Sequence, residues 1–314
     1  MKVISLFSGL GSQELGLKYA GVENLRIIAN CEISKRANIA YDCLHKTEIG
    51  NLGDITKIDE QTFPECDLLT YSFPCQDISC SGKERGIKVG TRSGLLFDVV
   101  RIIHHNKPKF LFMENVKNLL SKKHIHVFNN HIRHLESLGY GIAWQVFNSA
   151  DFGCPQNRER VFMMCILGET SDFVKGKMNR VNEYKKERVS LRTILCPEYN
   201  ESLVRVFPYE VVEQKRKSIC CCVGYKSNWK FKSTGRIFSI DYCSPCLVTR
   251  HKCYFMMDNN VVRYLNDREN YRLMGIRESD IDTLLAEPNI NHQSVCGNSI
   301  CVPIMEAIFR TFFT

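Results

Sequence analysis

Short apolar runs alternate with amphipathic stretches of helical length along the first half of the chain, and the runs end in glycine, proline or acidic residues. This alternation constrains the fold more than any other feature, because it is typical of a doubly wound, mostly parallel α/β sheet. The predicted strands are residues 3–7, 25–30, 67–72, 110–114, 141–148 and 161–166. The predicted helices are residues 13–20, 35–43, 94–105 and 126–138.

A second, smaller domain is expected, because 314 residues exceed the size at which single cores usually stop growing. Near residue 188 the pattern changes to short runs, cysteine clusters and a basic stretch at 226–232. Helical patterning returns at residue 266 and includes an amphipathic segment at 306–312. We predict a large α/β domain at 1–187, completed by 286–314, a smaller domain at 188–262 and a connecting segment at 263–285.

Composition limits the class of protein. Lysine and arginine exceed aspartate and glutamate by 42 to 34, and the resulting charge of +8 favours a nucleic-acid partner without establishing one. No run of about 18 apolar residues occurs and the N-terminus does not resemble a signal peptide, so we expect no membrane partner. The 16 cysteines show no regular spacing and no C-x-x-C pairs with histidines. We therefore expect reduced thiols, no metal site and a cytoplasmic protein.

A glycine loop at residues 7–11 (FSGLG) follows the first predicted strand, where glycines allow a tight turn close to a ligand. Glu32 ends the second strand about twenty residues later, the position of an acid that binds ribose hydroxyls in such folds. Asp54, in a GDI segment, could hold an adenine amino group; for both acids the alternative is a solvated helix cap. The phosphate-binding Gly-x-x-x-x-Gly-Lys motif is missing, so adenosine without pyrophosphate fits best. S-adenosylmethionine meets that description, and NAD stays open at this point.

Chemically capable side chains follow two further strands. Cys75, after Pro74, comes at the carboxyl end of the third strand, where a nearby helix N-terminus would favour a thiolate. Glu114 leaves the fourth strand, and a carboxylate there is costly without a partner or a role. Arg158 and Arg160 precede the last strand and point to one side of an extended segment, so they could hold a base, a phosphate or the glutamate. For each residue alone, a structural role fits at least as well as a functional one.

Taken in order, the segments FSGLG, Glu32, GDI, SFPCQ, RSGLLFD, ENV, QNRER and GNS (297–299) resemble the DNA cytosine-5 methyltransferases across nearly the full length. The layout is most similar to the small bacterial and phage restriction–modification enzymes of the HhaI type. The resemblance implies a Rossmann-like methyltransferase domain with a smaller target-recognition domain, and duplex DNA between them.

The resemblance also implies a mechanism. The Cys75 thiolate would add to carbon 6 of cytosine and so make carbon 5 nucleophilic. Glu114 would protonate or hydrogen-bond ring nitrogen 3 and the exocyclic amine, while Arg160, with Arg158, would orient the glutamate and contact the base. S-adenosyl-L-methionine would donate the methyl group and leave as S-adenosyl-L-homocysteine. The target base would have to be flipped out of the duplex.

Two sets of binding residues follow from the resemblance and the glycine loop. The predicted cofactor-binding residues are Phe7, Gly9, Leu10, Gly11, Glu32, Ile33, Asp54, Ile55, Pro74, Leu95, Asn298 and Ser299. The predicted DNA-binding residues lie in a loop at 79–92, which resembles the loop that closes over DNA, and in the recognition domain. They are Ser79, Ser81, Lys83, Arg85, Arg92, Lys226, Lys230 and Arg236.

Two departures from the family pattern are Ser12, where a second glycine is common, and Cys246, where threonine is usual, which leaves the packing there open. Neither touches Cys75, Glu114 or Arg160, so we expect an active enzyme. It would act on double-stranded DNA as a monomer, in DNA protection or with a separately acting restriction endonuclease, and bind DNA less tightly as salt rises.

Three rival classes fit the sequence less well. A tRNA-acting cytosine-5 methyltransferase shares the fold, but its Cys-Phe-Thr signature is absent and a recognition domain is present here. A binding-only relative should have lost Cys75 or Glu114. A dehydrogenase would need Gly-x-Gly-x-x-Gly, and position 14 is Glu.

Overall fold

The computed structural model describes residues 1–74, 92–212, 219–227, 235–249 and 251–314. The chain forms two compact units. The first comprises Met1–Phe147, Glu159–Tyr184 and Ile304–Thr314, and the second comprises Asn148–Arg158 and Lys185–Pro303. Residues 263–303, predicted as a connection and as the end of the first domain, thus belong to the second unit. The reason is local packing: the Val302 amide donates to the Met274 carbonyl, and Gln156 donates to the Leu273 carbonyl.

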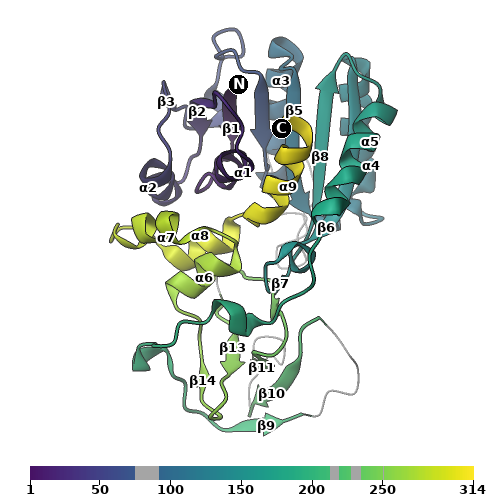
Figure 1. Ribbon diagram of the computed structural model, residues 1–314. Coiled ribbons are helices and arrows are strands. Elements are labelled where there is room, and N and C mark those ends of the chain that lie inside the picture. Colours follow the sequence, from purple (N-terminus) through teal and green to yellow (C-terminus); the bar gives the residue numbers. More distant parts are fainter. Residues whose placement is uncertain (75–91, 213–218, 228–234, 250) are drawn as a thin grey trace. The chain divides into compact units, whose positions relative to one another are not determined.

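The first unit is built on a seven-stranded sheet of order β3-β2-β1-β4-β5-β8-β6 (Figure 1). Neighbouring strands pair in parallel from β3 to β5, and β8 runs antiparallel to β5. The strands are β1 (Lys2–Leu6), β2 (Arg26–Cys31), β3 (Gly50–Asn51), β4 (Leu68–Tyr71), β5 (Phe110–Val116), β6 (Tyr140–Asn148) and β8 (Glu159–Leu167). All six predicted strands are confirmed, as is the mostly parallel α/β fold.

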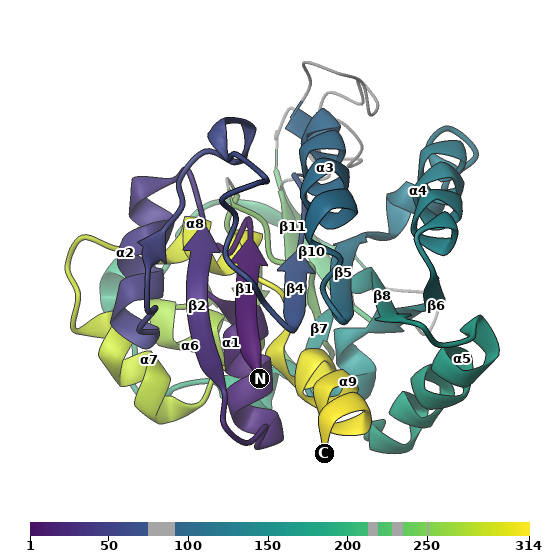
Figure 2. The same cartoon turned by 90° about the horizontal axis from the view of Figure 1, so that it is seen from above.

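Helices cover both faces of this sheet, with α1 and α9 on one side and α3 and α4 on the other (Figure 2). The strands are apolar on both faces for this reason: Phe112 contacts Phe309 of α9, while Tyr71 contacts His131 of α4. Gly16 lets α1 approach α9, since a Cβ there would lie 2.7 Å from the Met305 Cβ. The helices are α1 (Ser12–Ala20), α2 (Lys35–Leu44), α3 (Leu96–Asn106), α4 (Ile125–Ser137), α5 (Ser171–Arg180) and α9 (Val302–Phe313).

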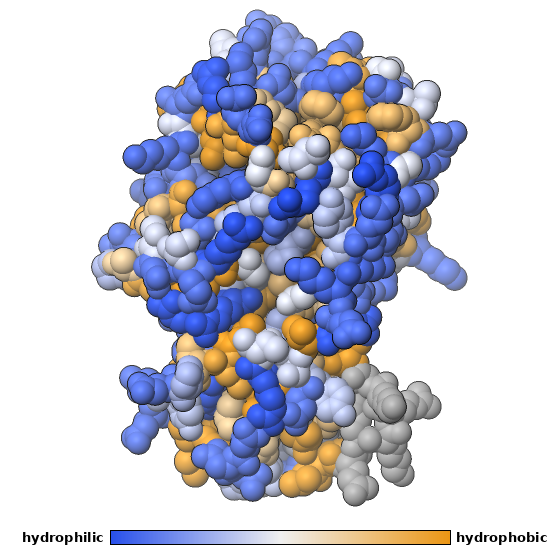
Figure 3. All heavy atoms as spheres, in the orientation of Figure 1, coloured by the Kyte–Doolittle hydropathy of each residue, from blue (hydrophilic) through white to orange (hydrophobic). Residues whose placement is uncertain are grey.

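In its described residues the second unit contains a five-stranded sheet of order β14-β13-β11-β10-β9, a small β12-β7 pair and three short α-helices. Its elements are β7 (Gln156–Asn157), β9 (Tyr209–Val211), β10 (Cys222–Lys226), β11 (Arg236–Ser239), β12 (Ser244–Pro245), β13 (Tyr254–Met256), β14 (Val262–Arg263), α6 (Asp267–Leu273), α7 (Glu278–Leu285) and α8 (His292–Asn298). The face of this unit drawn in Figure 3 mixes hydrophilic and hydrophobic side chains.

Short 3-10 helices connect these elements. They span Ile55–Lys57, Arg92–Leu95, Lys117–Leu120, Ser149–Phe152, Val181–Tyr184, Leu191–Ile194 and Glu201–Leu203. None of the helices in the described part of the chain has the length and apolarity needed to cross a bilayer. The described cysteines are free thiols, and the described ranges contain no cluster of metal-binding side chains.

Candidate active site

The glycine loop between β1 and α1 turns sharply beside the end of β2. Phe7, Gly9 and Gly11 all have positive φ values, of 56°, 58° and 83°. Gly11 is the position that glycine alone can fill, since a Cβ there would lie 2.2 Å from Nε2 of His45. The Phe7 amide donates to the Cys31 carbonyl at 2.7 Å. The loop is thereby held against β2, next to the predicted ribose-binding acid.

The Glu32 carboxylate is fixed by backbone donors on both sides. Oε2 accepts from the Gly9 amide at 3.0 Å and Oε1 accepts from the Ser34 amide at 2.7 Å. The Glu32 backbone is clamped in turn by the Asn51 side chain, which accepts from its amide at 2.9 Å and donates to its carbonyl at 2.8 Å. Ile33, the next residue, is 74% exposed although it is apolar. The predicted acid and an apolar surface therefore lie together at the end of β2.

Asp54 follows β3, the strand next to β2, and so lies at the same edge of the sheet as Glu32. Its Oδ1 accepts from the amide and hydroxyl of Thr56, at 3.0 and 2.8 Å, and these hydrogen bonds hold the pKa of the Asp54 carboxyl below its usual value. Asn51 also accepts from the Gly53 amide, so one asparagine links the Glu32 and Asp54 segments. Asn51 was not predicted from the sequence, because the only feature that marks it there is its position shortly before the GDI segment. Leu10 and Ile55, both predicted to line the cofactor site, are 2% and 3% exposed.

The segment that follows β4 is anchored by two side chains. The Asn115 amide donates to the Phe73 carbonyl at 3.1 Å, and the Gln13 amide donates to the Ser72 hydroxyl at 3.3 Å. These bonds fix the backbone that leads into Pro74, which is half-buried. Neither role was predicted.

Several predicted residues lie outside the described residues, and Arg92 begins a 3-10 helix at the edge of the described range. The residues outside are Cys75, Ser79, Ser81, Lys83, Arg85 and Lys230.

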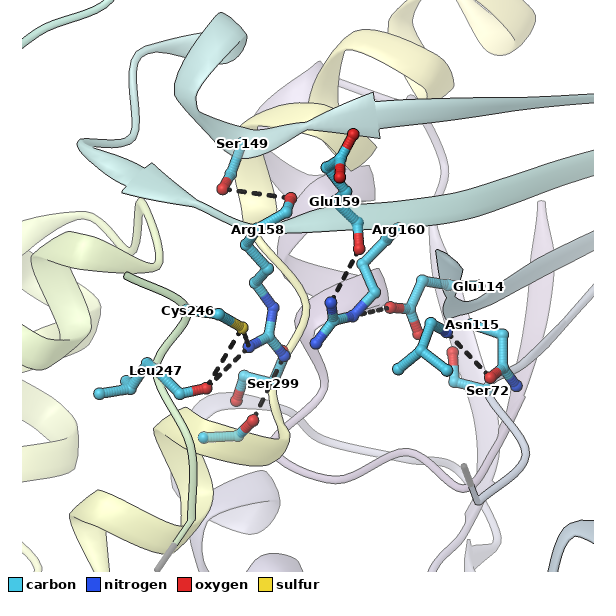
Figure 4. Close-up of polar contacts among 12 residues, drawn as sticks. Ser72, Glu114, Asn115, Ser149, Arg158, Glu159, Arg160, Cys246, Leu247 and Ser299 are labelled. Carbon is cyan, nitrogen blue, oxygen red and sulfur yellow. Dashed lines mark hydrogen bonds and ion pairs between the residues drawn. The ribbon is translucent and has the colours of Figure 1, made fainter. Parts of the chain in front are cut away.

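Glu114 and Arg160 form an ion pair at the carboxyl end of β5, with Nε to Oε1 at 3.2 Å (Figure 4). The antiparallel register places Arg160 opposite Val116, two residues beyond the glutamate. Arg160 also donates to the Glu159 carbonyl at 2.8 Å. The side chains are 16% and 9% exposed, so the pair is largely desolvated and its attraction is stronger than that of a surface pair. The predicted partnership of this arginine with this glutamate is thus present in the geometry.

Arg158 has a different set of partners from those predicted for it. It is 4% exposed, and its guanidinium donates to the carbonyls of Leu247 at 3.0 Å, Gly297 at 3.2 Å and Ser299 at 2.6 Å (Figure 4). It also contacts the Cys246 sulfur at 3.2 Å. Cys246, the departure from the usual threonine, therefore keeps an acceptor for this arginine. Through these hydrogen bonds the buried Arg158 side chain links two backbone segments within the second unit.

The GNS turn lies in the second unit, at the end of α8. Gly297 packs against a backbone segment, because a Cβ there would lie 2.6 Å from the Thr249 nitrogen. Ser299 is 5% exposed and its hydroxyl donates to the Val295 carbonyl at 2.6 Å. Asn298 ends the helix. Leu95, in the first unit, is half-buried against the core.

Two predicted DNA contacts fall on the five-stranded sheet of the second unit. Lys226 ends β10, and its ammonium lies 4.8 Å from the centre of the Phe207 ring. Arg236 begins β11 and is exposed.

The mostly parallel sheet carries a glycine loop, two acids at the ends of neighbouring strands and a glutamate–arginine pair, an arrangement that fits an α/β methyltransferase fold. The C-5 cytosine-specific DNA methylase family matches residues 1–314, and the chain therefore belongs to that family. Membership makes it an enzyme that methylates carbon 5 of cytosine in DNA.

Similar proteins agree with this assignment. The chain is 38% identical to the type II methyltransferase M2.ScrFI of Lactococcus lactis subsp. cremoris over 275 residues, which is 84% of this chain and 71% of that protein. It is 34% identical to the orphan methyltransferase M.SssI of Spiroplasma monobiae over 291 residues, 86% and 72% of the two chains. The crystal structure of the S. pombe Dnmt2 methyltransferase superposes with a TM-score of 0.73, covering 98% and 97% of the two chains at 20% identity. At that identity the likeness concerns the fold alone.

Proposed function

We propose that this enzyme transfers a methyl group from S-adenosylmethionine to carbon 5 of a cytosine flipped out of duplex DNA, within a short specific sequence, through a covalent bond between Cys75 and carbon 6. The observation that carries the proposal is the desolvated pair of Glu114 and Arg160 at the carboxyl end of β5. This strand pairs with β4, and the chain that continues from β4 through Pro74 leads directly to the cysteine.

The residues at the ends of β1 and β2 fit the predicted cofactor. Glu32 is held in one orientation by two backbone amides and can accept hydrogen bonds from ribose hydroxyls through its remaining lone pairs. Ile33 is exposed and offers an apolar surface for a flat adenine ring. Asp54 uses only Oδ1 for Thr56 among the described residues, which leaves Oδ2 to accept from an amino group. Bound there, the cofactor supplies an electrophilic methyl group.

The residues of the chain would then act in a fixed order. The Cys75 sulfur forms a bond to carbon 6, and the electron pair of the carbon 5–carbon 6 double bond moves toward ring nitrogen 3. Glu114 in its protonated form donates a proton or hydrogen bond to nitrogen 3 and stabilises that charge, while Arg160 holds Oε1 of the glutamate in place. Carbon 5 then takes the methyl group. A base removes the carbon 5 proton, and its electron pair restores the double bond as the cysteine thiolate leaves. The proton returns from nitrogen 3 to Glu114 as the ring regains its original bonding.

The biological setting is proposed from the relatives. One is named a type II methyltransferase and another an orphan methyltransferase. We place this enzyme in DNA protection within a restriction–modification system or on its own, with any cognate restriction endonuclease acting as a separate protein.

Transfer of labelled methyl groups from S-adenosylmethionine to duplex DNA tests the proposal, with wild type compared to Cys75→Ala and Glu114→Gln, and conversion sequencing of the product. We expect label on cytosine at one short sequence, none with Cys75→Ala and a loss of about 10²- to 10⁴-fold with Glu114→Gln. DNA containing 5-fluorocytosine should trap wild type as a covalent complex, because no carbon 5 proton can be removed. Label on an RNA copy of the sequence instead of on DNA would contradict the proposal.

A further inference from the structure

Three cations lie over one group of aromatic rings in the second unit. The guanidinium carbon of Arg205 is 4.5 Å from the centre of the Tyr264 ring, and the Lys252 ammonium is 5.7 Å from the same centre. The Lys226 ammonium is 4.8 Å from the centre of the Phe207 ring. We name these three cations, with Phe207, Tyr254 and Tyr264, the cation–aromatic cluster.

The rings of the cluster form a single platform. Tyr254 stacks on Tyr264 with ring centres 5.0 Å apart and an interplanar angle of 23°. Phe207 meets Tyr254 edge to face, also at 5.0 Å. Burial raises the pKa of Tyr254 to about 12, so this phenol carries no charge at neutral pH. The rings therefore hold the cations in place and add no negative charge that would neutralise them.

The strand register gathers these residues on one side of the sheet. Residues 203–207 run beside β14, since the Arg205 amide donates to the Val262 carbonyl and the Tyr264 amide donates to the Leu203 carbonyl. On β10, Lys226 pairs with Tyr209 while Tyr225 pairs with Glu210. Successive side chains of a strand point to opposite faces, so the glutamate lies on the face away from the lysine.

Contact with ring faces leaves donors of Arg205 and Lys252 available. A cation–π contact uses the charge and directs no N–H to an acceptor, and it contributes about 0.5–1 kcal/mol at an exposed site. Arg205 donates through one nitrogen to the Ser202 and Val204 carbonyls, and the Lys252 side chain is at an exposed position. Within the described ranges, no carboxylate forms an ion pair with either of these two residues. Each can still bind an anion.

From this arrangement we infer that the cation–aromatic cluster is a docking surface for the phosphate backbone of duplex DNA, with Arg205, Lys226 and Lys252 each contacting a phosphate. The inference rests on the proposed function, because duplex DNA is the partner assumed. Phosphate contacts set the position of a protein along DNA and dominate its affinity, without reading the sequence. Arg205 and Lys252 are new in this role, since the sequence pattern pointed to Lys226 alone among the three.

The salt dependence of DNA binding tests this surface. The full-length protein is titrated with a short fluorescein-labelled duplex of mixed sequence at increasing KCl, and log Kd is plotted against log salt concentration. Each lost phosphate contact lowers the slope by about 0.9, so Arg205→Gln/Lys226→Gln/Lys252→Gln should lower it by about 2.7. Lys252→Gln alone should lower it by about 0.9. This single variant changes an exposed side chain, so it keeps the test decisive if the triple variant does not fold.

A matched control removes three cations outside the cluster, at the exposed positions Lys175 and Arg180 of the first unit and Lys185, the residue with which the second unit resumes. The Lys175→Gln/Arg180→Gln/Lys185→Gln variant should keep the wild-type slope. A wild-type slope in the cluster variants, or an equal fall in the control, would overturn the docking surface. Methylation by the wild type is measured separately. If the wild type methylates DNA but the cluster variants keep its slope, only this surface is refuted. If the cluster variants lower the slope but the wild type does not methylate DNA, only the proposed function is refuted.

Discussion

The two arginines of the QNRER segment lie two residues apart but have different partners, and lysine substitutions should separate their roles. Arg158 bridges carbonyls on two segments, whereas Arg160 forms an ion pair with Glu114 and donates to the Glu159 carbonyl. We expect Arg158→Lys to lower the free energy of unfolding. Arg160→Lys should leave stability nearly unchanged and lower the rate of methyl transfer.

The magnitude follows from the geometry of Arg158. One guanidinium nitrogen donates to Leu247 and the other to Gly297 and Ser299, and a compact ammonium cannot reach both groups. At least one buried carbonyl then loses its donor, at about 1–3 kcal/mol for each. An ammonium is also more strongly hydrated than a guanidinium, which adds to the cost of burying it. A net loss of roughly 2–3 kcal/mol follows.

The cost at Arg160 is smaller because the carbonyl that it binds belongs to Glu159, an exposed residue. A lysine ammonium can keep the ion pair with Glu114, so the loss is that of one hydrogen bond, about 1 kcal/mol. A lysine would hold the Glu114 carboxyl group in a different position. Because the displaced carboxyl group stabilises the transition state less well, kcat should fall by roughly tenfold or more. Urea unfolding followed by circular dichroism gives the stability, and methyl transfer at saturating substrates gives kcat. Wild-type stability in Arg158→Lys, with the loss appearing in Arg160→Lys, would show that the partners have been assigned the wrong way round.

Three further predictions concern stability. Gly297→Ala should destabilise the protein by about 1–3 kcal/mol on urea unfolding, because its Cβ would lie 2.6 Å from a backbone nitrogen; wild-type stability would contradict this. Arg263→Met should cost about 3–5 kcal/mol in the same measurement, as it breaks a buried ion pair with Glu269 at 2.7 Å, and Arg263→Met/Glu269→Leu should recover much of that loss. Burial lowers the pKa of His131 to about 3, so the unfolded chain takes up this proton first and stability falls as the pH drops from about 6.5 toward 3. His131→Gln, which keeps an acceptor for the Tyr71 hydroxyl, should lose roughly 2 kcal/mol less than wild type between pH 6.5 and 5, and identical pH profiles would refute the assignment.

Local patterning predicted the first unit well. The strand expected at 110–114 is β5, Phe110–Val116, and the helix expected at 126–138 is α4, Ile125–Ser137. Such segments are determined by neighbours in the sequence, and apolar periodicity records them directly. The terminal helix, expected at 306–312, is longer, spanning Val302–Phe313, because its first turn contains a proline that is tolerated at a helix start.

The partners of Arg158 could not be predicted in the same way. Its acceptors lie 89 to 141 residues away, and they are backbone carbonyls, which every residue carries. Asn51 and Asn115 pose the same problem, since their side chains bind backbone groups and resemble ordinary turn asparagines in the sequence. Charged partners such as Glu114 were found because a buried carboxylate is rare enough to require an explanation.

The direction of β8 explains why the site could be assembled at all. Strands β1, β2, β4 and β5 are parallel, so the residues that follow them meet at one edge of the sheet. Glu114 is the last acid of β5, but Arg160 lies at the beginning of its strand, and in a parallel sheet it would lie at the opposite edge. Because β8 is antiparallel to β5, its first residues pair with the end of β5, and Arg160 faces Val116. The other functional residues of this chain follow their strands, whereas Arg160 comes at the start of its strand. That order is what an antiparallel strand requires, and it was already visible in the sequence.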